Sequence, residues 1–99
     1  MKKQVSVEDL FVTVWLAKRE QAQALGVRLR PMAAEDAMKQ ARRVLSGSRT
    51  SDGFASLADL KRLDLSLEAL VVDKRYTALF SDEEANNALI RLLDAGYQF

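Results

Sequence analysis

Serine and glycine residues divide the chain into segments that have the ends of helices. Ser6 is followed by Glu8 and Asp9, so the serine side chain can cap a helix while the two acids complement the positive end of its dipole. Three of the four glycines follow segments with helical spacing of apolar residues, where a left-handed residue ends a helix: Gly26, Gly47 and Gly96. Abundant alanine and a single proline add to this pattern, which predicts an all-α fold.

Three long helices are expected, over about 7–25, 32–45 and 82–95. In each of them apolar side chains recur three or four residues apart and would line one face. The last helix has the clearest beginning, because Ser81 and Glu84 have the spacing of a capping box, in which each side chain binds the other residue's backbone N–H. We expect a compact bundle of about four to five short helices, forming a single helical domain over 1–99.

The middle of the chain contains weaker signals. Segment 46–53 is rich in serine and glycine, which favour turns over regular structure, and it predicts a flexible loop. Ser56 can then cap a short helix through Leu63, and Ser66 can cap another that begins at Leu67.

The segment 63–72 is compatible with either a helix or a strand. Val71 and Val72 are β-branched, which favours a strand. Glu68 and leucines at helical spacing favour a helix. We expect a helix here, with a further turn beginning at Asp73.

The chain lacks the side chains that are most used in catalysis and metal binding. It contains no histidine and no cysteine, which removes proton transfer by imidazole near neutral pH, thiol nucleophiles and zinc-finger ligands. It also contains no glycine-rich phosphate-binding motif. We therefore expect a protein that is not an enzyme and has no catalytic site, cofactor, metal ion or small-molecule substrate.

Composition also bears on the location of the protein. The longest uncharged apolar run, Leu10 to Ala17, is too short to cross a bilayer, which takes roughly 20 residues. No membrane association is therefore expected. The absence of cysteine is typical of a reducing compartment, so the expected location is the cytoplasm.

Apolar side chains in two segments exceed what one helical face can hold. In the first helix they include Phe11 and Trp15, and later in the chain they include Leu67, Val71 and Val72. Such helices are either central to a core or covered by a partner. The leading hypothesis is an adaptor or regulator that binds another protein through these residues, a second copy of itself included. The alternative for the same residues is an ordinary core.

Positive charge is concentrated in the first half of the chain. Residues 1–50 carry ten Lys or Arg and five Asp or Glu, whereas residues 51–99 carry five and nine. The basic residues on and beside the second helix are the candidate nucleic-acid contacts: Arg28, Arg30, Lys39, Arg42, Arg43 and Arg49. The competing hypothesis is a regulator that binds nucleic acid, and the alternative for these residues is a solvated basic face. A third interpretation, an inhibitor of the kind that bacterial phages and mobile elements encode, has only composition behind it.

Overall fold

Residues 6–97 are described in the computed structural model, and they contain five α-helices and three short 3-10 helices. The α-helices are α1 (Val7–Ala24), α2 (Ala37–Ser46), α3 (Phe54–Asp59), α4 (Leu67–Val71) and α5 (Asp82–Asp94). The 3-10 helices are η1 (Ala34–Asp36), η2 (Leu63–Leu65) and η3 (Thr77–Leu79). No strand occurs within residues 6–97. The predicted all-α bundle is confirmed, and the ambiguous segment 63–72 is helical, as η2 followed by α4.

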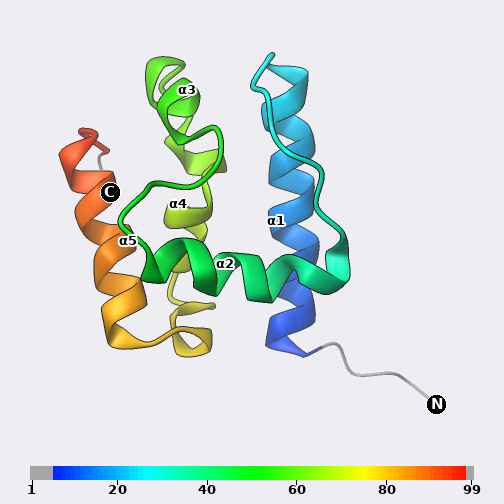
Figure 1. The fold of residues 1–99 in the computed structure, drawn as a ribbon, viewed down its shortest axis with the longest axis vertical. Coiled ribbons are helices and arrows are strands. Elements are labelled where there is room, and N and C mark those ends of the chain that lie inside the picture. Colours follow the sequence, from blue (N-terminus) through cyan, green and yellow to red (C-terminus); the bar gives the residue numbers. More distant parts are fainter. Residues whose placement is uncertain (1–5, 98–99) are drawn as a thin grey trace.

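The short helix α4 is the most enclosed element of the fold. Figure 1 shows α4 between α1 and α5, with α2 crossing over all three. Both α2 and α4 contact α1 on one side and α5 on the other. η2 contacts α1, α3 and α4 and so joins α3 to the bundle. Four of the five residues of α4 are buried as a result.

The core consists of two clusters of buried side chains. The larger lies between α1, α2, α4 and the turn before α5, and its centre is Phe11. The Phe11 ring centroid lies 5.5 Å from that of Tyr76 and 5.2 Å from that of Phe80, both in edge-to-face geometry, which aromatic rings prefer. The smaller cluster lies between α3, η2 and the end of α5 and includes Val27 and Leu57. Both clusters contain residues of α1 and α5, so these two long helices connect the halves of the core.

Most of the predicted helix ends are confirmed. Three serines each accept a hydrogen bond from the backbone N–H three residues later: Ser6, Ser66 and Ser81. The capping box is complete, because the Ser81 backbone N–H donates to Glu84 Oε1 at 2.8 Å. Gly26 and Gly96 are left-handed, with φ of +92° and +81°. Each ends its helix in a Schellman motif, in which two backbone N–H groups bond back to carbonyls of the last turn.

The start predicted for the second helix is wrong. The chain is extended at Met32 and Ala33, enters η1 and becomes α-helical only at Ala37. Figure 1 shows the reason, since the chain runs back along α1 before it turns into α2. An extended chain covers about 3.3 Å per residue against 1.5 Å for a helix, so an extended connector makes this return with fewer residues than a helix would need.

Two further details differ from the sequence prediction. Gly47 is extended, with φ of −85° and ψ of −179°, because the chain after α2 runs on into a loop instead of folding back on the helix. The helix after the loop begins at Phe54, ahead of the predicted cap Ser56. Gly53, with φ of +77°, makes the turn into this helix and allows Phe54 to be buried in the smaller cluster.

Candidate functional site

Three segments surround an open cleft of about 1020 Å³ on the α2 side of the molecule. They are the connector 27–33, of which residues 28–33 line the cleft, α2 and the loop 47–53. Residues of α1 and of the segments 54–57 and 65–67 complete the lining. Five arginines are among the lining residues: Arg19, Arg28, Arg30, Arg43 and Arg49. The lining contains only two acidic residues, Asp36 and Asp52. The cleft is therefore strongly basic.

The connector presents two of these arginines by strand-like alternation. Val27 is buried and Leu29 packs against the smaller core cluster. The residue that follows each of them, Arg28 and Arg30 respectively, is exposed. Alternate side chains of an extended chain point to opposite sides, so both guanidinium groups lie on the solvent side. The Arg30 backbone N–H also donates to Asp52 Oδ2 at 2.6 Å. This bond joins the connector directly to the end of the loop.

The other wall of the cleft comes from α2. This helix buries Ala41 and Leu45 and exposes the basic residues on its outer side. Arg43 lines the cleft, but Lys39 does not. Arg42 lies outside the lining as well, and its Nη2 donates to the Leu79 carbonyl at 3.4 Å.

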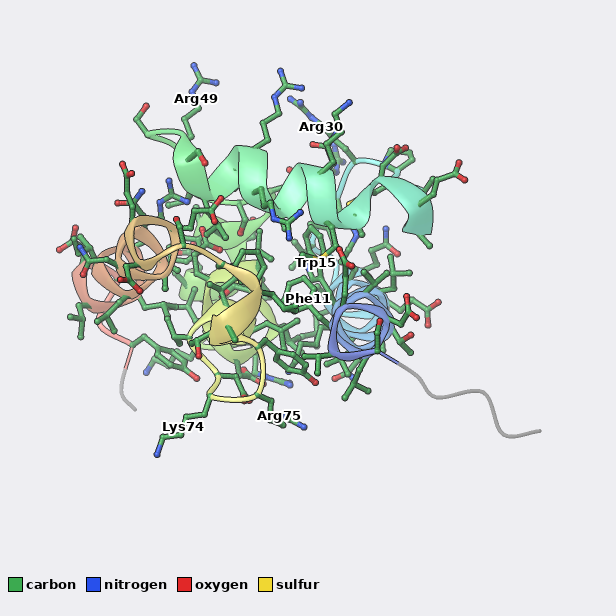
Figure 2. The ribbon with its side chains drawn as sticks, turned by 90° about the horizontal axis from the view of Figure 1, so that it is seen from below. Phe11, Trp15, Arg30, Arg49, Lys74 and Arg75 are labelled. Atoms are coloured by element: carbon green, nitrogen blue, oxygen red, sulfur yellow. The ribbon has the colours of Figure 1, made fainter. Side chains whose placement is uncertain are left out.

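The structure thus brings together four of the six predicted nucleic-acid contacts: Arg28, Arg30, Arg43 and Arg49. Figure 2 shows Arg30 and Arg49 projecting from the α2 side, with Phe11 and Trp15 in the interior and Lys74 and Arg75 on the opposite side. The cleft therefore belongs to one face of the molecule.

Arg19 is a cleft residue that sequence reasoning missed. Its guanidinium donates to the Arg30 carbonyl and lies 5.9 Å from the centroid of the Trp15 ring. Partial burial lowers the pKa of Arg19, and the nearby Asp52 carboxylate opposes this shift. An arginine stays protonated near neutral pH all the same. No local pattern indicated the role of Arg19, because the connector that it contacts is placed only by the tertiary fold.

The cleft arginines are not neutralised by ion pairs. In the described part of the chain, the salt bridges within 4.0 Å join Arg62 to Asp64, Arg75 to Asp73 and Arg91 to Glu68. All of these residues belong to the second half of the sequence. Hydrogen bonds from Arg75 lower the pKa of Asp73. Arg75 itself lies on the side away from the cleft (Figure 2). No salt bridge within the described residues therefore cancels the positive charge of the cleft arginines.

The loop 47–53, which lies within the segment 46–53 predicted to be flexible, is held at Gly47 and at Ser51 by a buried ion pair. The Glu68 side chain is 0% exposed and accepts hydrogen bonds from the Ser51 backbone N–H at 2.8 Å and from Ser51 Oγ at 2.5 Å. Arg91 Nη1 lies 3.6 Å from Glu68 Oε2, and Arg91 Nη2 donates to the Gly47 carbonyl at 2.5 Å. A glutamate within an otherwise apolar helix was the one signal in the sequence that could have indicated this anchor.

The candidate protein-interface residues lie mainly in the core of a single chain. Phe11, Trp15, Leu67 and Val71 are buried, and Val72 is half-buried against both core clusters. The proposed exposed apolar patch is therefore absent at these positions. The reason is topological: α1 is covered on its apolar side by α2 and α4, and α4 is enclosed between α1 and α5.

Other kinds of site find no support in the described residues. Over 6–97 no group of three or more acidic side chains is arranged to hold a metal ion. Among the helices of the same range, none combines the length and the hydropathy needed to span a bilayer. No match to this chain is found among protein-family models, curated protein sequences or solved structures. Among the features of the described residues, the basic cleft is the candidate functional site.

Proposed function

We propose that this protein binds nucleic acid by its phosphate backbone, in the basic cleft. The observation that carries the proposal is the convergence of five arginines, from α1, the connector, α2 and the loop, on one open cleft. None of the five forms a salt bridge within residues 6–97. Arginine is suited to this task because its planar guanidinium can bind a phosphate through two hydrogen bonds. Binding of this kind releases counterions from the nucleic acid and therefore weakens with salt.

The character of the lining favours an extended polyanion over a small molecule. Small-molecule pockets are mostly apolar and enclose the ligand, whereas this cleft is open and its lining contains five arginines against two acidic residues. Two aromatic residues are among its lining, but Trp15 is only 5% exposed and Phe54 only 6%. Their ring faces are not accessible for stacking on bases, which is the usual source of base contacts in single-strand binders. The proposed binding is accordingly tolerant of sequence.

Fluorescence anisotropy with a labelled single-stranded 20-mer of mixed sequence tests the proposal. Each phosphate contact contributes a slope of about −0.7 in log K against log salt, so five contacts give about −3.5. Affinity should therefore fall by roughly two orders of magnitude between 50 and 200 mM salt. The triple variant Arg28→Ala, Arg30→Ala, Arg43→Ala should bind weakly, with a slope reduced to about −1.4.

The control variant removes two positive charges from the opposite side of the molecule, against three in the triple variant. Lys74→Ala with Arg75→Ala lowers the net charge without touching the cleft (Figure 2), and it should retain the affinity and the slope. Competition with inorganic phosphate and with a poly-glutamate peptide separates other sources of negative charge. The proposal is wrong if there is no binding at 50 mM salt, if the two variants lose affinity equally, or if either competitor displaces the 20-mer at equal charge concentration.

A further inference from the structure

We infer that the buried Glu68–Arg91 ion pair is the positioning device of the cleft, and that it acts by holding Arg49 in place. The inference rests on the proposed function in one respect only, namely that Arg49 contacts a phosphate. Neither residue of the pair lines the cleft. Both act through the backbone of the loop 47–53.

The geometry shows how one pair can hold the whole loop. Arg91 donates to the carbonyls of Val44 and Gly47, at the end of α2 and the beginning of the loop. Glu68 accepts both hydrogen bonds from Ser51, on the far side of the loop. Between these anchors stand Ser48, Arg49 and Thr50, all exposed and all lining the cleft. Arg49 is thus the middle residue of a short span whose two ends bind the same buried pair.

Asp52 extends the constraint to the connector. It follows Ser51 directly, and its carboxylate accepts a hydrogen bond from the backbone N–H of Arg30. The fixed end of the loop is therefore also an anchor of the connector. Glu68 sets the position of Ser51, so it indirectly sets how Arg49 and Arg30 lie relative to each other.

The strength of the anchor follows from its burial. Hydrogen bonds to an ionised carboxylate are stronger than neutral ones, and low polarity around Glu68 strengthens them further. A neutral side chain at this position would leave Arg91 without its counter-charge and would weaken both bonds to Ser51. Arg49 makes no hydrogen bond of its own within the described residues, so the position of its backbone would then no longer be fixed.

A double-mutant cycle separates this positioning role from a general structural one. Binding of the labelled 20-mer is measured at 50 mM salt for Arg49→Ala and for Arg28→Ala, each with Glu68 present and with Glu68→Gln. With Glu68 present, each alanine substitution should weaken the affinity about eightfold at 50 mM salt. This factor follows from a slope of about 0.7 per contact, taken between 1 M and 50 mM salt. With Glu68→Gln, Arg49→Ala should cost less than twofold while Arg28→Ala keeps its full effect. Equal losses for Arg49→Ala in both backgrounds would overturn the inference, as would equal weakening of both arginines.

Trypsin gives a second readout that needs no nucleic acid. Cleavage after Arg49 should be at least several times faster in Glu68→Gln than in the unsubstituted protein. Cleavage after Lys61, in an exposed turn outside the loop, should be unchanged. Ser51→Ala, which keeps the ion pair but loses the Oγ hydrogen bond, should give an intermediate rate and serves if Glu68→Gln does not fold.

The two readouts fail independently. Unchanged cleavage after Arg49 in both variants overturns the positioning role, whether or not the protein binds the 20-mer. Absence of binding by the unsubstituted protein overturns the proposed function, while faster cleavage after Arg49 still supports the anchor.

Discussion

At the scale of single residues, Gly53 is the position where the fold leaves least choice. Its φ of +77° is left-handed, a conformation that side chains disfavour. A Cβ built there would lie 2.7 Å from Leu29 Cδ2 and 2.7 Å from Val27 Cγ1, closer than carbon atoms approach. Glycine is therefore needed both for the turn and for the close packing of the loop on the connector. These two segments carry Arg49 and Arg30.

Gly53→Ala should destabilise the protein by about 2–5 kcal/mol. This figure combines left-handed strain of about 1–2 kcal/mol with overpacking of about 1–3 kcal/mol. Gly26→Ala is the matched control, because Gly26 is also left-handed but has no atom within 4 Å of its built Cβ. It should lose only about 1–2 kcal/mol. Urea unfolding measures both values, and equal losses would show that Leu29 and Val27 yield without cost.

At the scale of the elements, three helices end in the same way. A residue in the left-handed conformation follows α1, α3 and α5. At each of these ends two backbone N–H groups donate to carbonyls of the last helical turn. For α1 and α5 that residue is glycine, but for α3 it is Lys61, with φ of +58°. Lysine has a Cβ that this conformation crowds. The end of α3 is therefore strained, whereas the same motif at the ends of α1 and α5 is not, because glycine occupies the left-handed position there.

Lys61→Gly should accordingly stabilise the protein by about 0.5–1 kcal/mol. Relief of about 1–2 kcal/mol of strain is partly offset by the greater freedom of glycine in the unfolded chain. The same substitution within a helix has the opposite sign: Lys39→Gly, near the start of α2, should cost up to about 1 kcal/mol. Thermal unfolding of the two variants side by side tests the contrast. A loss of stability in both would show that Lys61 makes contacts worth more than its strain.

The elements differ in how well the sequence predicts them. Elements whose ends depend on neighbouring residues are predicted well, and those that depend on contacts between distant segments are not. α1 and α5 were predicted closely because Ser6, Ser81 and their terminal glycines act within a few residues. The late start of α2 was not predictable, since it depends on the distance from the end of α1 to the core. The cleft shows the same division: most of its arginines could be named, but Arg19 and the anchor Glu68 act only on residues brought near by the fold.

At the scale of the whole molecule, the uneven distribution of charge along the sequence corresponds to different places in the fold. All five cleft arginines come from the basic first half of the chain. The acidic second half supplies Glu68 behind the loop and Asp52 at its end, while its own salt bridges lie within that half. The halves are not simply two surfaces of opposite charge packed together. One half presents positive charge, and the other positions the segment that carries part of it.

Glu68→Ala should destabilise the whole protein by about 3–5 kcal/mol, because it leaves Arg91 buried without a counter-charge. The pair connects α4, α5, the end of α2 and the loop, so the loss should appear as a shift of one cooperative unfolding transition. Glu20→Ala, at an exposed site in α1, is the control and should stay within about 0.5 kcal/mol. Urea unfolding gives both values, and similar small losses would mean that water replaces the ion pair.

The anchoring of the loop at Gly47 and Ser51 has a consequence for how this chain can vary. Surface loops are ordinarily where proteins tolerate insertions and deletions. Here three residues separate two points that bind the same buried pair, so the span works as a spacer of fixed length. We therefore expect substitutions at positions 48–50 to be tolerated. Insertions or deletions there should not be, because they would break one of the two anchors.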